Sequence, residues 1–368
     1  MLRLQRLAHF IKKIRIQIRS NTPLNLLIKS GAAILLLLLL YFDLTSNDKL
    51  GDIWIAFQHQ LKTADLPLLV VVLLLMPLNW MAEAEKWRQF VHRYEHFPRR
   101  KALLAVMTGV SFSLFTPNRV GEYGGRMLYV HPRNQWRAIV ANLVGNFCQF
   151  MVLLGIGAIG SMYIIHRFEL VDPTLGNLLI AAAVTGSAAM LWCYYHIDLV
   201  IDIIKRLQVV HPFLPWLRQL NLGVIRQYST SDLTNILRWA LIRFVIYSVQ
   251  YYLLLRFFGI NPGIIPGFAG IAALFLLQTS IPLPPVAGLV ARGNMAVLLW
   301  EQFGANEIAA LAATFSLWVI NLVIPALIGT FSFFYVNISK SLGYEEDTIQ
   351  DDIETIPSGR HWVPEPPQ

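Results

Sequence analysis

Charge and cysteine are both scarce in this chain. Of its 368 residues, 14% are Asp, Glu, Lys or Arg and 55% are hydrophobic, whereas a soluble globular protein is about 25% charged. This composition excludes an ordinary soluble domain. The two cysteines, Cys148 and Cys193, both lie inside apolar segments, which excludes a disulfide-stapled scaffold and a cysteine zinc site.

Catalytic signatures are also missing from the sequence. It contains no His-Glu-x-x-His pair, no nucleophile elbow and no phosphate-binding glycine loop. We therefore expect no metal, no other cofactor and no enzymatic reaction. The 30 Lys and Arg outnumber the 22 Asp and Glu. Because these basic residues lie beside the apolar runs, they indicate membrane topology, and we expect no nucleic-acid partner.

Long apolar runs are what the chain has instead. Several reach the roughly 20 residues that a helix needs to cross a bilayer, so the sequence predicts an all-α polytopic membrane protein. Two further hydrophobic segments, near 102–130 and 263–303, are interrupted by proline, glycine and arginine. We expect about six spanning helices, near residues 24–44, 65–81, 138–165, 177–196, 234–258 and 307–336.

The charges of the connecting segments predict the orientation. Cytoplasmic loops of membrane proteins carry an excess of Lys and Arg, which here places both termini in the cytoplasm. The chain then divides into a basic N-terminal segment (1–23), a transmembrane domain (24–338) and an acidic, proline-rich tail (339–368) that we expect to be disordered. The basic segments are the N-terminus, 86–101, 131–137 and 205–238, whereas 45–62, 166–176 and 259–263 carry little positive charge.

With this orientation, the two interrupted segments face each other from opposite leaflets. The segment 102–130 enters and leaves on the cytoplasmic side, and the segment 263–303 enters and leaves on the outer side. Two re-entrant helical hairpins in an inverted repeat, with their breaks meeting near the midplane, are typical of a transport site. The alternative, in which each segment forms two ordinary short spans, stays open. The expected breaks are at Pro117 in the first segment and at Pro282, Pro284, Pro285 and Gly288 in the second.

The first break combines charge with an interrupted backbone. Pro117 ends one half-helix, and the exposed N–H groups of the next half-helix favour an anion. Arg119, in the first turn of that half-helix, adds a guanidinium fork that matches phosphate. Gly121 allows another helix or a lipid head group to approach closely, and Glu122 can pair with Arg119 or Arg126, or bind a proton or a cation.

Further arginines at membrane depth, Arg126, Arg243 and Arg292, give an excess of positive charge that needs a partner. A phosphate-bearing lipid is the natural one. The alternatives are that Arg126 snorkels to the interface and that Arg243 bonds a backbone carbonyl for structure alone. The polar residues Asn142, Asn146 and Gln149 share one helix face and either line the cavity or join helices. The predicted substrate-binding residues are Arg119, Gly121, Glu122, Arg126, Arg243 and Arg292.

The block Pro117-Asn-Arg-Val-Gly-Glu122 is similar to the Pro-x-Arg-x-Gly-Glu block of the lysylphosphatidylglycerol synthase/flippase family. Together with the later block from Pro284 to Gly288, it makes the chain resemble the transmembrane flippase-like domain of that family, over about residues 24–336. The later block departs from the family pattern. Where the family has Pro-Gly-Gly-x-Gly followed by an acid, this chain has Pro284-Pro-Val-Ala-Gly288 followed by Ala291-Arg292.

The resemblance implies a lipid-translocating domain in a bacterial cytoplasmic (inner) membrane. The roughly 30 residues after the transmembrane domain are too few to hold the soluble aminoacyltransferase domain of full-length members, so we expect a stand-alone domain. The first hypothesis is a flippase or scramblase for a phosphate-bearing phospholipid or polyprenyl phosphate. The alternative is an accessory protein of cell-envelope lipid or glycolipid synthesis that binds such a lipid without moving it. A minor third reading is a polyprenyl-phosphate transferase. Membrane lipids are the expected partners, and a homo-oligomer stays possible.

Overall fold

The computed structural model describes residues 50–63, 66–114, 116, 119–196, 229–279 and 288–334, and all regular elements in these ranges are helices. The prediction of an all-α protein is therefore confirmed. Some predictions fall outside the described residues: the N-terminal segment 1–23, the first span at 24–44, most of the connection at 197–228 and the tail 339–368. The prolines Pro117, Pro282, Pro284 and Pro285 also lie outside them.

Five helices of the described ranges are long and apolar enough to cross a membrane. They agree with the five expected spans that these ranges include, so the chain is a multi-pass membrane protein. The last of them consists of α13 (Glu307–Trp318), the π-helical turn η5 (Val319–Val323) and α14 (Ile324–Phe334). The other four are α4 (Leu66–Val91), α7 (Gln135–Arg167) with the preceding 3-10 turn η2 (Pro132–Asn134), α8 (Pro173–Tyr195) and α10 (Thr230–Phe257).

Local signals explain where several helices begin. The Ser229 side chain accepts from the backbone N–H of Asp232 while the Asp232 carboxylate accepts from the N–H of Ser229, which forms a capping box at the start of α10. The carboxylate of Asp172 accepts from the N–H groups of Thr174 and Leu175 and caps α8. The Asn306 side chain caps α13 in the same way.

The helix α4 is longer than the sequence predicts. The expected span ends at residue 81 and a basic loop was expected from residue 86, whereas α4 continues to Val91. The reason is a stripe of buried apolar side chains, Trp80, Ala84, Trp87 and Val91, which recur every three or four residues and pack into the core. The extension carries charged residues into the protein interior.

The segment 45–62 was expected to be a loop, but α3 (Leu50–Thr63) occupies most of it and packs against α13. Ile53 is buried in this contact, and Trp54 stacks on Phe57. Asp52 in the first turn and Lys62 in the last turn match the helix dipole. The helix therefore forms from an amphipathic sequence that is too short and too polar to span a bilayer.

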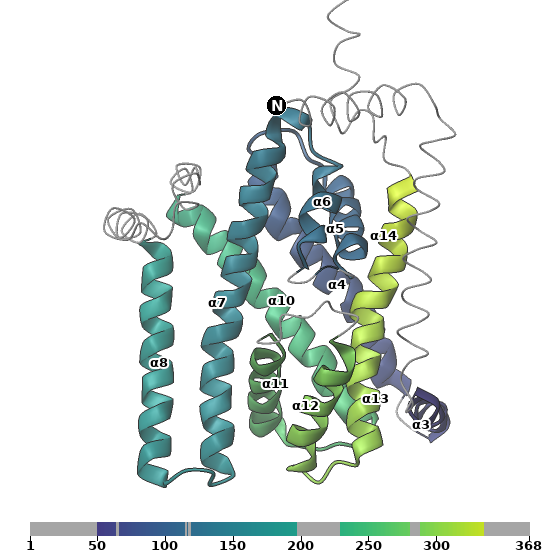
Figure 1. The fold of residues 1–368 in the computed structure, drawn as a ribbon, viewed down its shortest axis with the longest axis vertical. Coiled ribbons are helices and arrows are strands. Elements are labelled where there is room, and N and C mark those ends of the chain that lie inside the picture. Colours follow the sequence, from purple (N-terminus) through teal and green to yellow (C-terminus); the bar gives the residue numbers. More distant parts are fainter. Residues whose placement is uncertain are drawn as a thin grey trace, which may run out of the picture.

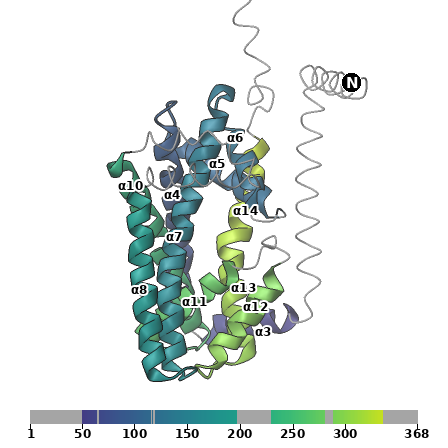
Figure 2. The ribbon, with the colours of Figure 1, turned by 60° about the vertical axis from the view of Figure 1, so that its left-hand side comes forward.

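Two helical hairpins lie in opposite halves of the molecule. In Figure 1, α5 (Arg99–Ser113) and α6 (Gly121–Met127) lie in the upper half, and α11 (Ile264–Thr279) and α12 (Leu289–Glu301) lie in the lower half. Figure 2 shows the same separation from a second direction. Each hairpin has its own hydrophobic cluster, one around Trp87 and Phe97 and the other around Tyr251 and Trp300.

Three long helices join the two halves. The helix α7 contacts α6 in the upper half and α11 in the lower half, and α10 contacts α4 as well as α11. The helix α4 also packs against α5. Side chains on α4, α7 and α10 can therefore meet residues of either hairpin near the middle of the molecule, and this is where the charged residues gather.

Candidate functional site

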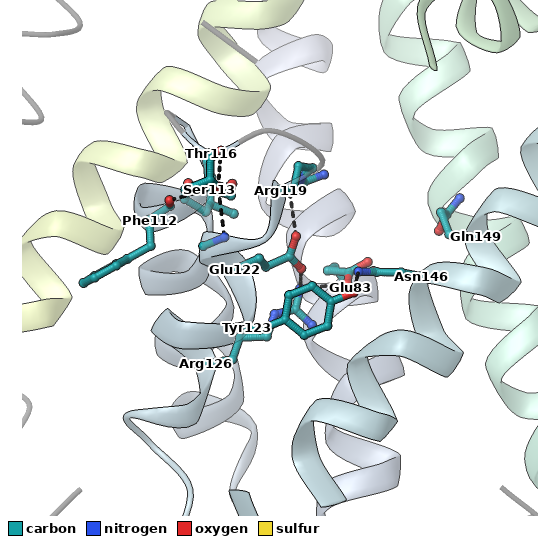
Figure 3. A network of polar contacts seen from close by, with 12 residues as sticks. Glu83, Phe112, Ser113, Thr116, Arg119, Glu122, Tyr123, Arg126, Asn146 and Gln149 are labelled. Atoms are coloured by element: carbon teal, nitrogen blue, oxygen red, sulfur yellow. Dashed lines mark hydrogen bonds and ion pairs between the residues drawn. The ribbon is translucent and has the colours of Figure 1, made fainter. Parts of the chain in front are cut away.

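A buried carboxylate on α4 is the centre of the site. Glu83 is 2% exposed, and its carboxylate oxygens lie 2.7 Å from Lys86 Nζ, 2.9 Å from an Arg126 guanidinium nitrogen and 3.0 Å from an Arg243 guanidinium nitrogen. These cations come from α4, α6 and α10. One carboxylate thus joins three helices, and Figure 3 shows Glu83 beside Arg126.

A second buried carboxylate, Glu122 on α6, extends the network. It pairs with Arg126 one turn along the same helix and lies 3.2 Å from an Arg119 guanidinium nitrogen (Figure 3). Of the alternatives that the sequence left open for Glu122, a pair with Arg119 or Arg126 or the binding of a proton or cation, the structure shows ion pairs with both arginines. Arg126 is 2% exposed and is bound to both glutamates, so it does not snorkel to the interface.

Tryptophan rings cover two of the arginines. The Arg126 guanidinium carbon lies 5.5 Å from the centre of a Trp87 ring, and that of Arg243 lies 5.2 Å from the centre of a Trp80 ring. Both distances are in the cation–π range. Because Trp80 and Trp87 are on α4 together with Glu83, this helix supplies both the negative charge and the aromatic faces that hold the arginines.

Arg119 differs from the other arginines in its backbone and its exposure. Its φ of +58° is in the left-handed region, which residues other than glycine enter at a cost of about 1–2 kcal/mol. The sequence placed Arg119 in the first turn of a half-helix, but α6 begins at Gly121 and Arg119 precedes it in a turn. Its side chain is 38% exposed, so it can contact a ligand without leaving its ion pair.

The start of α6 is closed by α5. The Gly121 N–H donates to Thr116 Oγ1 at 2.9 Å (Figure 3). A Cβ at Gly121 would collide with the carbonyl group of Phe112. The absence of a side chain therefore lets α5 and α6 approach, which is the helix-packing alternative of the sequence analysis. With seven residues and its first N–H already bonded, α6 does not provide the free helix terminus that was expected to bind an anion.

The second hairpin adds one arginine to the same region. Arg292 on α12 lies within electrostatic range of Arg119 and of Tyr247 on α10, and Tyr247 in turn interacts with Arg119 and Arg243. Arginines from both hairpins and from α10 therefore lie within electrostatic range of one tyrosine. Gly288 makes room for this arrangement, because a Cβ there would lie 3.2 Å from the guanidinium carbon of Arg292.

The helix α7 supplies polar groups on the side facing α4 and α6. The amide of Asn146 lies 3.4 Å from the hydroxyl of Tyr123, and Lys86 donates to Gln149 at 3.5 Å. The Gln149 amide also donates to the carbonyl of Ala240 on α10 at 3.4 Å. These bonds join helices, as expected for interhelical contacts. Asn142 is 2% exposed, and neither amide atom has a hydrogen-bond partner among the residues described.

Sequence reasoning missed Glu83 and Lys86. Both belong to α4, but the predicted span ended before them and the predicted basic loop included Lys86. The signal that identifies them is the continuing stripe of Trp80, Ala84 and Trp87, because an acid and a base three residues apart inside such a stripe are carried into the core. In the ranges that the structure covers, no group of three or more His, Cys, Asp and Glu side chains is arranged to hold a metal ion.

Comparison with known proteins assigns the family. The curated protein sequences contain no match to this chain. The family model described as the lysylphosphatidylglycerol synthase TM region matches residues 26–329, which includes both hairpins and every residue of the charged network. The resemblance found at Pro117 to Glu122 is thereby confirmed over most of the chain. The chain belongs to the lysylphosphatidylglycerol synthase transmembrane-region family.

Proposed function

We propose that the protein moves a phosphate-bearing lipid between the leaflets of a bacterial cytoplasmic membrane, with both chain termini in the cytoplasm. The observation that supports it best is the buried ion-pair network in which Lys86, Arg119, Arg126 and Arg243 share the two carboxylates of Glu83 and Glu122, with Arg292 within electrostatic range of Arg119. These arginines come from the two opposed hairpins and from a helix that passes both. A head group held there contacts both halves of the molecule at once.

The balance of charge supports an anionic ligand. A charged side chain at the centre of a bilayer costs about 2.5–3.5 kcal/mol even on the mildest scales, so each buried cation needs a partner. Arg126 shares Glu83 with Lys86 and Arg243, and Arg119 shares Glu122 with Arg126. Guanidinium groups match the geometry of phosphate oxygens. A lipid phosphate therefore supplies the charge that the two carboxylates leave uncompensated.

Differences in exposure assign different roles to the arginines. The side chain of Arg126 is 2% exposed and that of Arg243 is 17% exposed, whereas that of Arg119 is 38% exposed. We assign Arg119 and Arg292 to direct contact with the head group and Arg126 to the positioning of Glu122. Arg243 lies between the two groups, because it pairs with Glu83 and also reaches Tyr247.

The opposed hairpins supply the means of movement. We interpret them as re-entrant hairpins of an inverted repeat, in which one half rocks against the other and exposes a fixed site first to one leaflet and then to the other. The proposal assigns no covalent chemistry to the chain. Directionality then comes from an ion gradient or from consumption of the lipid on one side.

Reconstitution in liposomes tests the proposal. We expect the protein to accelerate the crossing of an acyl-labelled fluorescent anionic phospholipid, measured by quenching the outer leaflet with dithionite. A binding accessory protein, the alternative, retains anionic lipid through purification but accelerates nothing. Absence of acceleration for every anionic lipid would discard translocation in favour of that alternative.

The variant Arg119→Gln tests the site. A hydrogen bond to a charged group contributes about 1.5–3 kcal/mol, so we expect the crossing rate to fall about tenfold or more. The free energy of unfolding should change by less than about 1 kcal/mol, because the lost ion pair is partly exposed. The matched control is Arg256→Gln, an exposed arginine at the end of α10. A normal crossing rate for the Arg119 variant would leave the proposed function in place but would rule out this site.

A further inference from the structure

The last span runs through both halves of the molecule, and its two parts are attached to different hairpins (Figure 1). The helix α14 packs against α5 of the first hairpin, and α13 packs against α12 of the second. The π-helical turn η5 lies between the two parts. We propose that η5 is the hinge at which this span bends when one half moves against the other. This inference rests on the proposed function, because transport is what requires the halves to move.

The attachment of α14 to α5 is close and polar. The Ser111 hydroxyl donates to the carbonyl of Ala326 at 2.5 Å, and the Thr108 hydroxyl donates to the carbonyl of Gly329 at 3.4 Å. A Cβ at Gly329 would lie 1.9 Å from the carbonyl oxygen of Met107, so the two backbones are in direct contact. Because α14 cannot slide without breaking these contacts, we expect it to move with the first hairpin.

The helix α13 is attached to the other half. Its Thr314 hydroxyl lies 2.7 Å from the hydroxyl of Tyr251 on α10. Towards α12, a Cβ at Gly293 would lie 2.9 Å from Leu311 Cδ2, so these two helices also pack closely. Movement of one hairpin against the other therefore requires a bend between α13 and α14.

The two hydrophobic clusters meet at the same level of the molecule. In the last span, Leu317 belongs to the cluster of the second hairpin and Val323 to that of the first. In α4, Val72 belongs to the cluster of the second hairpin and Trp80 to that of the first. Both helices thus pass from one core to the other over a short segment, and in α4 this segment contains Pro77.

Proline weakens both helices at this boundary. Pro325 has no N–H group, so it cannot donate to the carbonyl of Asn321, four residues earlier. The hydrogen-bond ladder widens there, and the Ile324 N–H donates to the carbonyl of Val319, five residues earlier. Pro77 likewise removes one hydrogen bond from α4. Since sharp bends in helices occur at prolines and π-helical turns, these two helices bend more easily than α10, which contains neither proline nor glycine.

One hydrogen bond joins the two weakened places. Asn79 Nδ2 donates to Asn321 Oδ1 at 3.0 Å, and these residues are 1% and 4% exposed. The Asn79 Oδ1 has no donor among the residues described, so this bond alone links the two side chains. A hydrogen bond between membrane helices changes an equilibrium by a factor of about three on average. It can therefore favour this conformation and still open during transport. Asn79 lies one turn before Glu83 on α4, beside the charged network.

Distances between spin labels test the hinge. The labels are attached through Leu298→Cys on α12 and Phe331→Cys on α14, at positions that are 68% and 69% exposed. The background carries Cys148→Ala and Cys193→Ala, and without labels it is the reference for crossing. The protein is placed in liposomes of phosphatidylcholine with and without phosphatidylglycerol. We expect two distances, in proportions that phosphatidylglycerol changes. A single distance that is the same in both membranes would overturn the hinge.

Variants at the boundary sharpen the test. Pro325→Ala restores the missing N–H group and stiffens the span, so we expect one distance and a crossing rate at least about tenfold lower. The matched control is Pro173→Ala at the start of α8, where a proline takes the place of an N–H that has no helical partner. It should change neither measurement. The double variant Asn79→Leu, Asn321→Leu removes the hydrogen bond and should change the proportions of the two distances about threefold.

The outcomes separate the hinge from the proposed function. Two distances and normal crossing in Pro325→Ala would overturn the hinge and keep translocation. Two distances in the reference protein without crossing of any anionic lipid would keep the hinge and overturn translocation. Unchanged proportions in the double variant would overturn the role of the bond between Asn79 and Asn321.

Discussion

The two hairpins lie in opposite halves of the molecule, and different contacts hold them. Around α6 the contacts include ion pairs, centred on Glu83 and Glu122, both 2% exposed. Around α11 and α12 they are aromatic and neutral. Tyr251 stacks on Phe275 with ring centres 5.8 Å apart, and its hydroxyl bonds Thr314 at 2.7 Å and the Trp300 indole at 3.0 Å.

This difference suggests that the two halves respond differently to a charged ligand. Ion pairs in a low-dielectric interior are strong but specific to their partners, so a new anion can redistribute them. Aromatic packing and neutral hydrogen bonds respond little to charge. Under the proposed function, the half with α5 and α6 would respond to a bound phosphate, and the half with α11 and α12 would hold Arg292 in a constant place. Four substitutions test this contrast, from the largest expected effect to the smallest.

The largest effect is expected from Glu83→Gln. Removing this charge leaves Lys86, Arg126 and Arg243 without their shared partner, and breaking a buried ion pair costs about 3–5 kcal/mol. The measurement is the free energy of unfolding by SDS titration in mixed micelles. The matched control is Glu85→Gln, since Glu85 pairs with Arg88 and Arg99 nearer the surface and should lose about 1 kcal/mol or less. If both variants lost the same unfolding free energy, Glu83 would not be the central partner of the network.

Gly121→Ala should have the next largest effect. The added methyl group would collide with the Phe112 carbonyl, which is backbone and cannot rotate away. Overpacking of this kind costs about 1–3 kcal/mol. The same titration measures it, and Gly124→Ala is the control, because no atom lies within 4 Å of a Cβ at Gly124. A stable Gly121 variant would show that α5 and α6 tolerate separation.

Tyr251→Phe tests the aromatic half. The change removes the hydroxyl that accepts from the Trp300 indole at 3.0 Å and bonds Thr314 at 2.7 Å. Leaving a buried donor unsatisfied costs about 1–3 kcal/mol, so we expect a loss of about 1–2 kcal/mol in unfolding free energy. Lipid crossing should keep its dependence on head-group charge. A changed dependence would contradict the assignment of charge sensing to the other half.

Gly288→Ala should have the smallest effect on stability. The added methyl group would meet only the flexible end of the Arg292 side chain, 3.2 Å away. The guanidinium can move aside, so we expect less than about 1 kcal/mol of destabilisation and a crossing rate reduced a few-fold. Gly288→Ala should therefore impair crossing more than stability, whereas Gly121→Ala should impair stability more than crossing. Unchanged crossing would indicate that the position of Arg292 is not critical.

The sequence predicts the helical class and the five described spans because the length of an apolar run is enough to identify a membrane helix. It also offers the pairing of Glu122 as one alternative, because the possible partners are three and four residues away. It does not predict Glu83, because the polar residues after residue 81 resemble a loop until tertiary packing buries Trp87. Nor does it predict the left-handed backbone of Arg119 or its electrostatic interaction with Arg292, since both depend on how the two hairpins are arranged in the fold.

The three-way attachment of Glu83 has a mechanical consequence. Because a single carboxylate is bound to cations on α4, α6 and α10, none of these helices can slide without giving up a buried contact. We therefore expect them to travel as one body during transport.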